Sequence, residues 1–311
     1  MAAQTVRAGR REVEVTHPGK VLFPADGITK RDLVDYYLTA AGRMLPHLAD
    51  RPLMLARFPE GIDGQRIVQK NVPSYFPGWI QRAEVPRIGG RGGAVCHVIA
   101  GSPAALAYLA NQACIEAHVL LSRVSAVHRP DQLVFDLDPP GPEGFGDARL
   151  AALALRGLLE DELGLVAFPR TTGGNGLHVH VPLRAEEDFD AVRGLAAGVA
   201  GVLAGRHPDL VTTERRRAAR GGRVYADIMR NAYAQTVIAP YAVRARPGAT
   251  VSAPLRWDEV ADPGLNPQMF TLRTMPERLA GGEPDADPWA GMGRRRRGLR
   301  AARGRLSRLA G

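Results

Sequence analysis

The stretch Leu133-Val134-Phe135-Asp136-Leu137-Asp138-Pro139-Pro140 places two carboxylates two residues apart in an apolar run. Its β-branched and aromatic residues, followed by two prolines, predict a buried strand. Residues i and i+2 of a strand share a face, so Asp136 and Asp138 should project together while Phe135 and Leu137 pack on the other side. Two adjacent carboxylates repel each other, and burying them is costly without a cation. The pattern favours a divalent metal site; a strand that simply ends in an Asp-rich turn is the alternative.

The composition limits the class of protein. The chain has 311 residues, 45% hydrophobic and 23% charged, so it can bury one large core or two modest ones. It shows no signal peptide and no run of about 18 apolar residues that would span a membrane. Cys96 and Cys114 are the only cysteines, which argues against a disulfide framework or a cysteine-based zinc site. We therefore expect a soluble, cytoplasmic protein with no membrane partner.

The positive charge is concentrated at the C-terminal end. The net charge is +9, and residues 291–311 contain eight of the 41 basic residues and no acid. The remaining 33 basic residues nearly balance the 32 acidic ones. The sequence predicts a catalytic body over 1–290 and a basic tail over 291–311 that is disordered or marginally helical. Such a tail suits non-specific contact with phosphate backbones, and a purely solubilising tail is the alternative.

Lysine is scarce in this chain. Only Lys20, Lys30 and Lys70 stand among 38 arginines, and all three fall in the first quarter of the sequence. A lysine retained in an arginine-rich background is expected where a compact, strongly hydrated charge is needed. A chance remainder of three is the competing explanation.

Helix and strand signals alternate along the chain. A capping box from Thr29 to Asp32 predicts one helix, and Ser102-Pro103 predicts a second helix that reaches His118. Further helices are expected over 147–163 and 188–203, and strands over 13–15, 53–58, 133–138, 166–170, 177–181, 224–229 and 236–243. Without repeats or an internal linker, this order predicts a single domain of the mixed α/β (α+β) class.

The loop Thr171-Thr172-Gly173-Gly174-Asn175-Gly176 joins two of these strands. Glycines let the backbone approach a ligand closely, and successive N–H groups can cradle phosphate oxygens. The loop is not a Walker motif, because it lacks Gly-Lys-Ser/Thr and a strand follows it. An ordinary hairpin turn is the alternative.

Three further residues bear on the carboxylate pair. His178 and His180 share a strand face, but no third ligand at a suitable spacing supports zinc. We expect His178 to face the site and donate to a phosphate, with His180 peripheral. Asp227 would be an ordinary surface residue by itself. With Asp136 and Asp138 it supplies the third carboxylate that a two-metal phosphoryl-transfer site requires.

Together these motifs resemble the polymerase domain of bacterial ligase D, a member of the archaeo-eukaryotic primase superfamily. The resemblance rests on 133–139, 172–178, 227–231 and 238–244 in that order, and extends to 19–24, 27–30, 69–71 and 115–118. It covers about residues 12 to 275. It implies a primase-polymerase-like fold in a stand-alone chain, with helices flanking a mixed central sheet that carries the carboxylates.

The resemblance also implies roles for individual residues. Asp136, Asp138 and Asp227 would hold two divalent metals, Mn²⁺ or Mg²⁺. The incoming NTP or dNTP would be contacted by Thr172, His178 and Arg244, with Asn175 and His118 close by. Lys20 and Lys30 would bind a DNA 5′-phosphate beside His17, and Lys70 and Asn71 would contact template or primer.

Five residues depart from the family pattern. Ile67-Val68 stands where relatives often have an aromatic pair that stacks on the template base, so stacking should be weaker. His17 replaces a frequent Asn, Thr172 replaces a frequent Ser, and Asn175 lacks a positive charge that some relatives place there. None of these changes touches the carboxylates, so we expect intact catalysis and altered recognition of DNA ends.

The resemblance implies a template-directed nucleotidyltransferase that adds nucleotides, preferably ribonucleotides, to primer 3′ ends during gap filling and non-homologous end joining. Its substrates would be nucleoside triphosphates and gapped or broken duplex DNA with a 5′-phosphate. No Lys-x-Asp-Gly ligase motif is present, so a separate ligase and the end-binding protein Ku are expected partners of a nucleoid-associated enzyme. A metal-dependent phosphoesterase or nuclease and a non-catalytic DNA-end-binding module are the alternatives.

Overall fold

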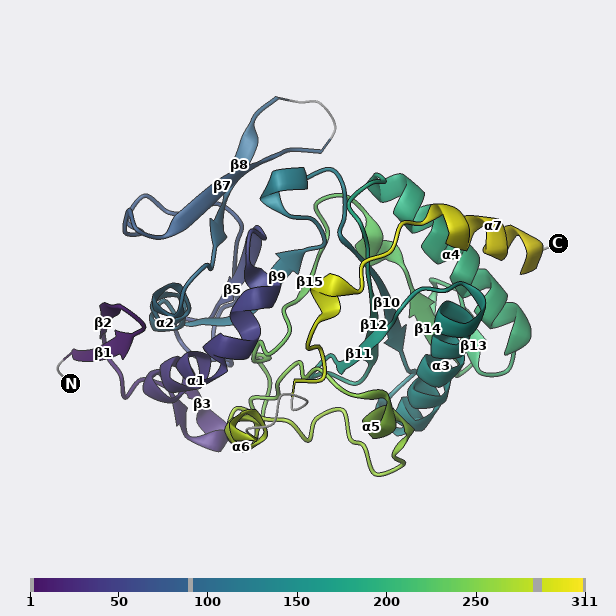
Figure 1. Cartoon of the computed structure of the whole chain (residues 1–311). Helices are drawn as coiled ribbons and strands as arrows, with labels where there is room; N and C mark the ends of the chain where they lie inside the picture. Colours follow the sequence, from purple (N-terminus) through teal and green to yellow (C-terminus); the bar gives the residue numbers. More distant parts are fainter. Residues whose placement is uncertain (1–2, 89–91, 282–286, 310–311) are drawn as a thin grey trace. The chain divides into compact units, whose positions relative to one another are not determined.

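Two large β-sheets organise the chain, each within its own unit. The computed structural model describes residues 3–88, 92–281 and 287–309 (Figure 1). The first unit comprises 1–125, 236–252 and 268–286, and the second comprises 126–235, 253–267 and 287–311. The expected division into a catalytic body over 1–290 and a tail over 291–311 stays a prediction. Because the chain passes repeatedly between the units, no one linker marks the boundary in the sequence.

The first unit is built on a six-stranded antiparallel sheet. Its strands are β5 (Leu53–Arg57), β6 (Ile67–Gln69), β7 (Gln81–Pro86), β8 (Ala94–Ile99), β9 (Cys114–Leu120) and β15 (Thr236–Ile238). Their order is β15-β9-β5-β8-β7, with β6 paired to β5. Two small hairpins belong to the same unit, β1 (Gln4–Ala8) with β2 (Arg11–Val15) and β3 (Val21–Phe23) with β4 (Ile28–Thr29).

Helix α1 (Lys30–Leu48) begins at the predicted capping box. The Thr29 hydroxyl accepts a hydrogen bond from the Asp32 backbone N–H, and the Asp32 carboxylate accepts one from the Thr29 N–H. These bonds satisfy two of the backbone donors that a helix leaves open at its start. The apolar face of α1 packs against α2 (Pro103–Asn111), and α6 (Met275–Ala280) also contacts α1.

Helix α2 is shorter than the sequence predicted. It starts at Pro103 with Ser102 as its N-cap, as expected, but it ends at Asn111 rather than reaching His118. Ala113 adopts a left-handed φ of 55°, which stops the helix, and β9 follows at once. The β-branched Ile115 and Val119 favour the strand, and α2 packs against it.

The second unit carries a five-stranded mixed sheet, which confirms the predicted fold class. Its order is β11 (Phe168–Thr171), β12 (Leu177–Pro182), β10 (Gln132–Asp138), β14 (Val224–Asp227) and β13 (Val211–Thr212). Neighbours are antiparallel except β13 and β14, which are parallel. The fully buried Leu133, Phe135 and Leu137 of β10 lie in its core.

Four helices belong to this second unit. They are α3 (Phe145–Gly157), α4 (Phe189–Arg206), α5 (Trp257–Ala261) and α7 (Arg300–Leu309). Helices α3 and α4 both pack against β10, and a π-helical turn over 158–162 continues α3. No helix in the described ranges of either unit combines the length and apolar content needed to cross a membrane.

The basic tail is not disordered over 300–309. It forms α7, which packs against α4 and buries Ala302 and Leu306 (Figure 1). A Cβ atom on Gly198 of α4 would lie 2.8 Å from the Leu306 side chain, so the glycine admits the close approach. The prediction of a disordered tail rested on its eight arginines. It overlooked Ala302 and Leu306, which lie four positions apart and share the buried face of the helix.

Replacing the N-cap tests the start of α1. Thr29→Ala should lower the free energy of unfolding by about 1 kcal/mol, because the Asp32 N–H loses its side-chain acceptor. Urea denaturation followed by far-UV circular dichroism would measure the loss. Thr39→Ala in the same helix is the matched control. Its hydroxyl bonds only the Asp35 carbonyl, so its removal should cost almost nothing, and equal costs would contradict the capping role.

Candidate active site

The three predicted carboxylates come together in the second unit. In the antiparallel register Asp136 of β10 pairs with Asp227 of β14, and Asp138 lies two residues further along β10. One oxygen from each carboxylate lies within 4.8 Å of the others. Each side chain is half-buried, while Phe135 and Leu137 are fully buried on the opposite face, as the strand pattern predicted.

The three carboxylates repel one another, and a bound cation would relieve this repulsion. Burial and the charges of Asp136 and Asp227 raise the pKa of Asp138 to about 7. Burial alone would also raise the pKa of Asp136, but His178, with Arg230 and Arg170 further off, holds it below its usual value. The Asp136 Oδ1 atom is buried, and His178 Nε2 lies 3.2 Å from it. A half-buried set of three carboxylates suits hard divalent ions such as Mg²⁺ or Mn²⁺.

His178 stands beside Asp136 with a fixed orientation. The two residues are paired across β10 and β12, and His178 Nε2 lies 3.2 Å from Asp136 Oδ1. On the other side of the ring, the fully buried Arg170 guanidinium lies 2.6 Å from His178 Nδ1. Because a guanidinium only donates, Nδ1 accepts and the proton of the neutral imidazole resides on Nε2, facing Asp136.

Arg170 fixes His180 in the same way. Its Nε donates to His180 Nε2 at 2.9 Å, and His180 Nδ1 lies 3.0 Å from the Gln132 side-chain oxygen. His180 therefore belongs to a buried polar chain that includes Arg170 and Gln132. Sequence reasoning missed Arg170. Its only signal was an arginine at the end of a strand of otherwise apolar residues, opposite a histidine pair.

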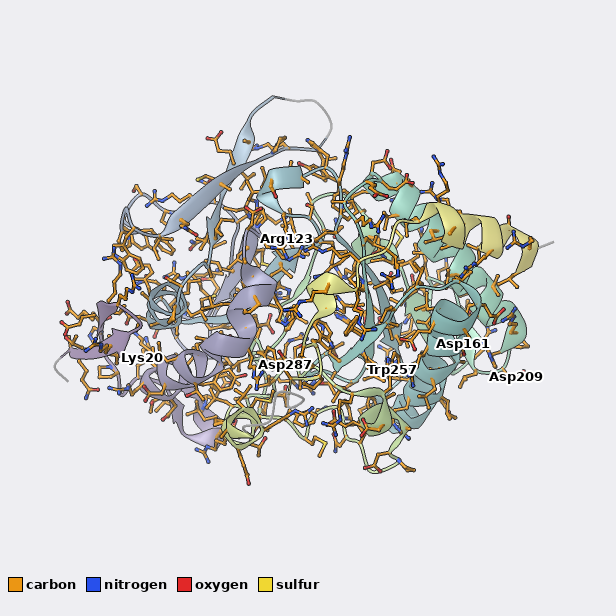
Figure 2. All side chains as sticks on the ribbon, viewed as in Figure 1. Lys20, Arg123, Asp161, Asp209, Trp257 and Asp287 are labelled. Atoms are coloured by element: carbon orange, nitrogen blue, oxygen red, sulfur yellow. The ribbon has the colours of Figure 1, made fainter. Side chains whose placement is uncertain are left out.

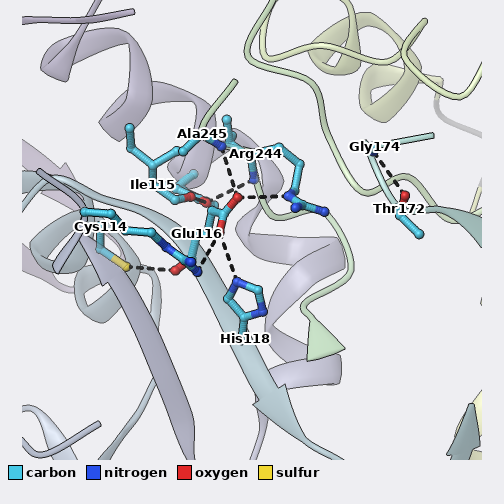
Figure 3. A network of polar contacts seen from close by, with 11 residues as sticks. Cys114, Ile115, Glu116, His118, Thr172, Gly174, Arg244 and Ala245 are labelled. Atoms are coloured by element: carbon cyan, nitrogen blue, oxygen red, sulfur yellow. Dashed lines mark hydrogen bonds and ion pairs between the residues drawn. The ribbon is translucent and has the colours of Figure 1, made fainter. Parts of the chain in front are cut away.

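The loop between β11 and β12 holds its own turn. The Thr172 hydroxyl accepts from the Gly174 N–H at 3.1 Å (Figure 3). It donates to the Gly176 carbonyl at 3.2 Å. Asn175 is half-buried beside them. A Cβ on Gly176 would meet the Leu137 carbonyl at 2.4 Å, so only glycine allows the loop to approach β10 this closely. The glycines thus place Thr172 next to the carboxylate strand.

A second polar cluster lies in the first unit around Glu116 of β9. Its carboxylate accepts from Arg244 Nε at 2.9 Å and from the Ala245 N–H at 3.2 Å, and lies 3.1 Å from His118 Nε2 (Figure 3). Arg66 lies 3.6 Å away. Burial would raise the pKa of Glu116, but hydrogen bonding by His118 and the charge of Arg244 lower it to about 2.

Glu116 was not among the predicted site residues, although His118 and Arg244 were. Its signal was an acid two residues before a histidine in an apolar strand, which places both side chains on one face. The 7% exposed side chain carries a permanent charge that fixes the orientation of Arg244. Burial is the largest influence on His118 and lowers its pKa, while the hydrogen bond to Glu116 opposes that shift.

The predicted phosphate-binding residues gather at a turn of the first unit. The Lys20 N–H donates to the His17 carbonyl, and the Lys30 N–H donates to the Lys20 carbonyl. The Lys20 ammonium pairs with Glu60 at 2.9 Å. Lys30 is 7% exposed and its ammonium donates to the Thr16 carbonyl at 2.7 Å. Burial and the charge of Lys20 lower the pKa of Lys30.

The remaining predicted contacts flank β6. Lys70 is exposed, whereas the Asn71 side chain accepts from the Cys96 N–H at 3.0 Å and so holds β8. Ile67 and Val68, at the place of the expected aromatic pair, are exposed to 39% and 53%. This surface presents aliphatic side chains and one ammonium group to solvent.

The known proteins to which this chain is similar are all LigD proteins. The family model described as "LigD, primase-polymerase domain" matches residues 29–289. The multifunctional non-homologous end joining protein LigD of Mycolicibacterium smegmatis is 38% identical over 262 residues, covering 83% of this chain and 34% of that protein. Its Mycobacterium tuberculosis counterpart is 40% identical over 268 residues with the same coverage. The chain thus spans about a third of the length of these relatives.

A solved structure is similar over nearly the whole chain. It is the polymerase domain from Mycobacterium tuberculosis ligase D in complex with DNA, with a TM-score of 0.82 and 37% sequence identity. The match covers 92% of this chain and 99% of the other. The bifunctional LigD of Bacillus subtilis is more distant, at 31% identity over 89% of this chain and 44% of that protein.

The raised pKa of Asp138 predicts a pH-dependent cost in the absence of metal. The unfolded carboxyl loses its proton near pH 4 and the folded one near pH 7, so the folded state becomes less stable as the pH rises between these values. Asp138→Asn removes this charge. In EDTA at pH 8 the variant should be more stable than the parent by roughly 1–3 kcal/mol, and below pH 4 the difference should vanish.

Urea unfolding at a series of pH values measures this difference. Asp209→Asn, which changes an exposed carboxylate of the same unit, is the control and should leave the curve unaltered (Figure 2). Mn²⁺ should stabilise the parent more than Asp138→Asn. A parent that is as stable as the variant at pH 8 would show that the cluster does not repel itself.

Proposed function

The chain belongs to the LigD primase-polymerase domain family, and on this premise we propose that it is a template-directed nucleotidyltransferase that extends primer 3′ ends. The observation that carries the proposal is the cluster of Asp136, Asp138 and Asp227 on adjacent strands, since phosphoryl transfer between nucleotides depends on such carboxylates. Gap filling and non-homologous end joining are the proposed settings, and ribonucleotides the preferred substrates.

The three carboxylates are the proposed holders of two divalent ions, Mn²⁺ or Mg²⁺. Bound there, such ions would favour deprotonation of the primer 3′-hydroxyl and neutralise charge on the departing pyrophosphate. The raised pKa of Asp138 supports this assignment. Its ionised form is unfavourable beside two other carboxylates, and a bound cation would make that form favourable. His178 presents its Nε2–H on the same side and would donate to a phosphate oxygen.

Contacts to the triphosphate are proposed for each unit by itself. In the second unit the proposed contacts are the hydroxyl of Thr172, the amide of Asn175 and the imidazole of His178. In the first unit they are Arg244 and His118, which Glu116 orients. Guanidinium contacts to phosphate are charge-assisted and geometrically specific, so an arginine held by a buried carboxylate suits this task.

Gapped or broken duplex DNA with a 5′-phosphate is the proposed nucleic acid substrate. The similar ligase D polymerase domain was solved with DNA, which supports DNA as a ligand here. Lys20, Lys30 and His17 would bind the 5′-phosphate, with the Lys30 ammonium exchanging the Thr16 carbonyl for a phosphate oxygen. Lys70 and Asn71 would contact template or primer. Ku and a separate ligase are the proposed partners, at a nucleoid location.

Primer extension on a gapped duplex tests the activity. With Mn²⁺ and nucleoside triphosphates the parent should lengthen the primer and release pyrophosphate. Asp136→Ala should abolish extension, because the remaining two carboxylates cannot complete the metal site. Asp209→Ala is the matched control and should extend like the parent.

Other outcomes separate the alternatives. A shortened primer would indicate a nuclease that uses the same carboxylates, and binding of 5′-phosphorylated gaps without any extension would indicate an end-binding module. Extension by Asp136→Ala within tenfold of the parent would exclude the proposed metal site. Parallel reactions with ribo- and deoxynucleotides would measure the sugar preference.

Nucleotide binding tests Arg244. Arg244→Ala should raise the apparent nucleotide Kd by about 10- to 100-fold, since a charge-assisted contact to phosphate contributes roughly 1.5–3 kcal/mol. Glu116→Gln should raise it less, because the arginine remains but loses its charged anchor. Arg87→Ala, an exposed arginine of the same unit, is the control. A Kd that is unchanged in Arg244→Ala would place this residue outside the nucleotide site.

A further inference from the structure

The arginines of residues 294–308 are divided by the fold into two groups. Arg296 pairs with the buried Asp131 at 3.5 Å, and Arg303 pairs with Glu187 at 3.2 Å. The other six are exposed and form no ion pair with the described residues: Arg294, Arg295, Arg297, Arg300, Arg305 and Arg308. Asp131 and Glu187 thus neutralise two of the arginines. The other six leave a concentrated positive charge on the surface.

This segment is part of the second unit and contacts it at several points. The Trp289 indole donates to the Pro169 carbonyl at 2.9 Å. The Arg184 N–H donates to the Arg297 carbonyl at 3.0 Å, and the Arg297 N–H donates to the Pro182 carbonyl at 3.2 Å, beyond the end of β12. Leu306 then docks α7 against Gly198 of α4. The backbone that carries the arginines is therefore held in a fixed arrangement.

The outward face of α7 carries arginines and small residues, with no large apolar side chain. At 100° per residue, Arg300 and Arg308 point away from the buried Ala302 and Leu306, about 12 Å apart along the axis, with Arg305 at the edge of the same face. An amphipathic helix that binds a bilayer inserts its apolar face. Here that face is buried against α4, and the charged groups on the exposed surface are guanidinium groups, which match phosphates.

We propose that residues 294–308 form a fixed basic surface, the α7 ridge, that binds the phosphate backbone of duplex DNA. The ridge follows residue 289, where the match to the family model ends, so it adds a contact outside the matched domain. The inference rests on the proposed function in taking DNA as the partner. It concerns affinity for any duplex, not recognition of an end or a nucleotide.

The salt dependence of DNA binding tests the ridge. Blunt duplex DNA without a 5′-phosphate is titrated in EDTA, and fluorescence anisotropy is recorded over a series of NaCl concentrations. The triple variant Arg300→Gln, Arg305→Gln, Arg308→Gln should flatten the slope of log K against log salt by about 2–3 and weaken binding at least tenfold. The control triple Arg7→Gln, Arg10→Gln, Arg87→Gln removes equal charge from exposed positions of the first unit and should change binding much less.

A second variant separates a fixed ridge from a flexible basic tail. Leu306→Gln keeps every arginine but removes the contact that docks α7, so it too should flatten the slope. Parent-like binding by either the ridge triple or Leu306→Gln would overturn the proposal. The proposal would also be overturned if the ridge triple lost binding to vesicles of phosphatidylglycerol and phosphatidylcholine while its DNA binding was unchanged.

One further variant keeps this test independent of the proposed activity. Asp136→Ala should bind blunt duplex with the slope of the parent, because the ridge needs neither metal nor nucleotide. Loss of extension with normal duplex binding, or normal extension with a flattened slope, would then report on the two proposals separately. Equal weakening by both triples would overturn the ridge and indicate a general charge effect.

Discussion

Repulsion among three carboxylates is the constraint around which the second unit is arranged. The antiparallel register of β10, β12 and β14 brings Asp136 opposite both Asp227 and His178, so the backbone hydrogen bonds of the sheet hold the charges together. Burial of Phe135 and Leu137 on the opposite face prevents the strand from turning over. Sheet and core thus maintain an arrangement that the charges alone would disperse, and a divalent cation reverses the sign of that interaction.

Each unit also contains a buried charge that orients its polar neighbours. Arg170 in the second unit and Glu116 in the first are both buried, and each engages a histidine by hydrogen bonding or close polar contact. A buried ion is tolerated only where several partners compensate its lost hydration. These partners also fix the orientation of the buried side chain. Arg170 in turn orients His178, and Glu116 orients Arg244. Rigid polar chains of this kind suit a site that must receive a highly charged ligand without rearranging.

Local patterns predicted the strands that carry the carboxylates and the helices that pack on them, and long-range contacts explain several elements that they missed. The alternation of Asp136 and Asp138 with apolar residues, and the capping box at Thr29, each express a rule that holds within a few residues, and both predictions are confirmed. The strand β9 was mistaken for helix because its alanine-rich approach has helical propensity, while pairing with β5 decides its conformation. The docking of Leu306 depends on a glycine about a hundred residues away, which no local window contains.

The interleaving of the two units has a consequence for how the chain reaches its native state. Strand β15, from residues 236–238, completes the sheet of the first unit, and the Tyr36 hydroxyl of α1 donates to the carbonyl of Tyr241. The second unit similarly requires Trp289 and α7. On the ribosome, neither unit can finish before nearly the whole chain has emerged. Contacts of such long sequence separation favour slow, concerted folding, so partial chains would expose unpaired sheet edges to chaperones and proteases.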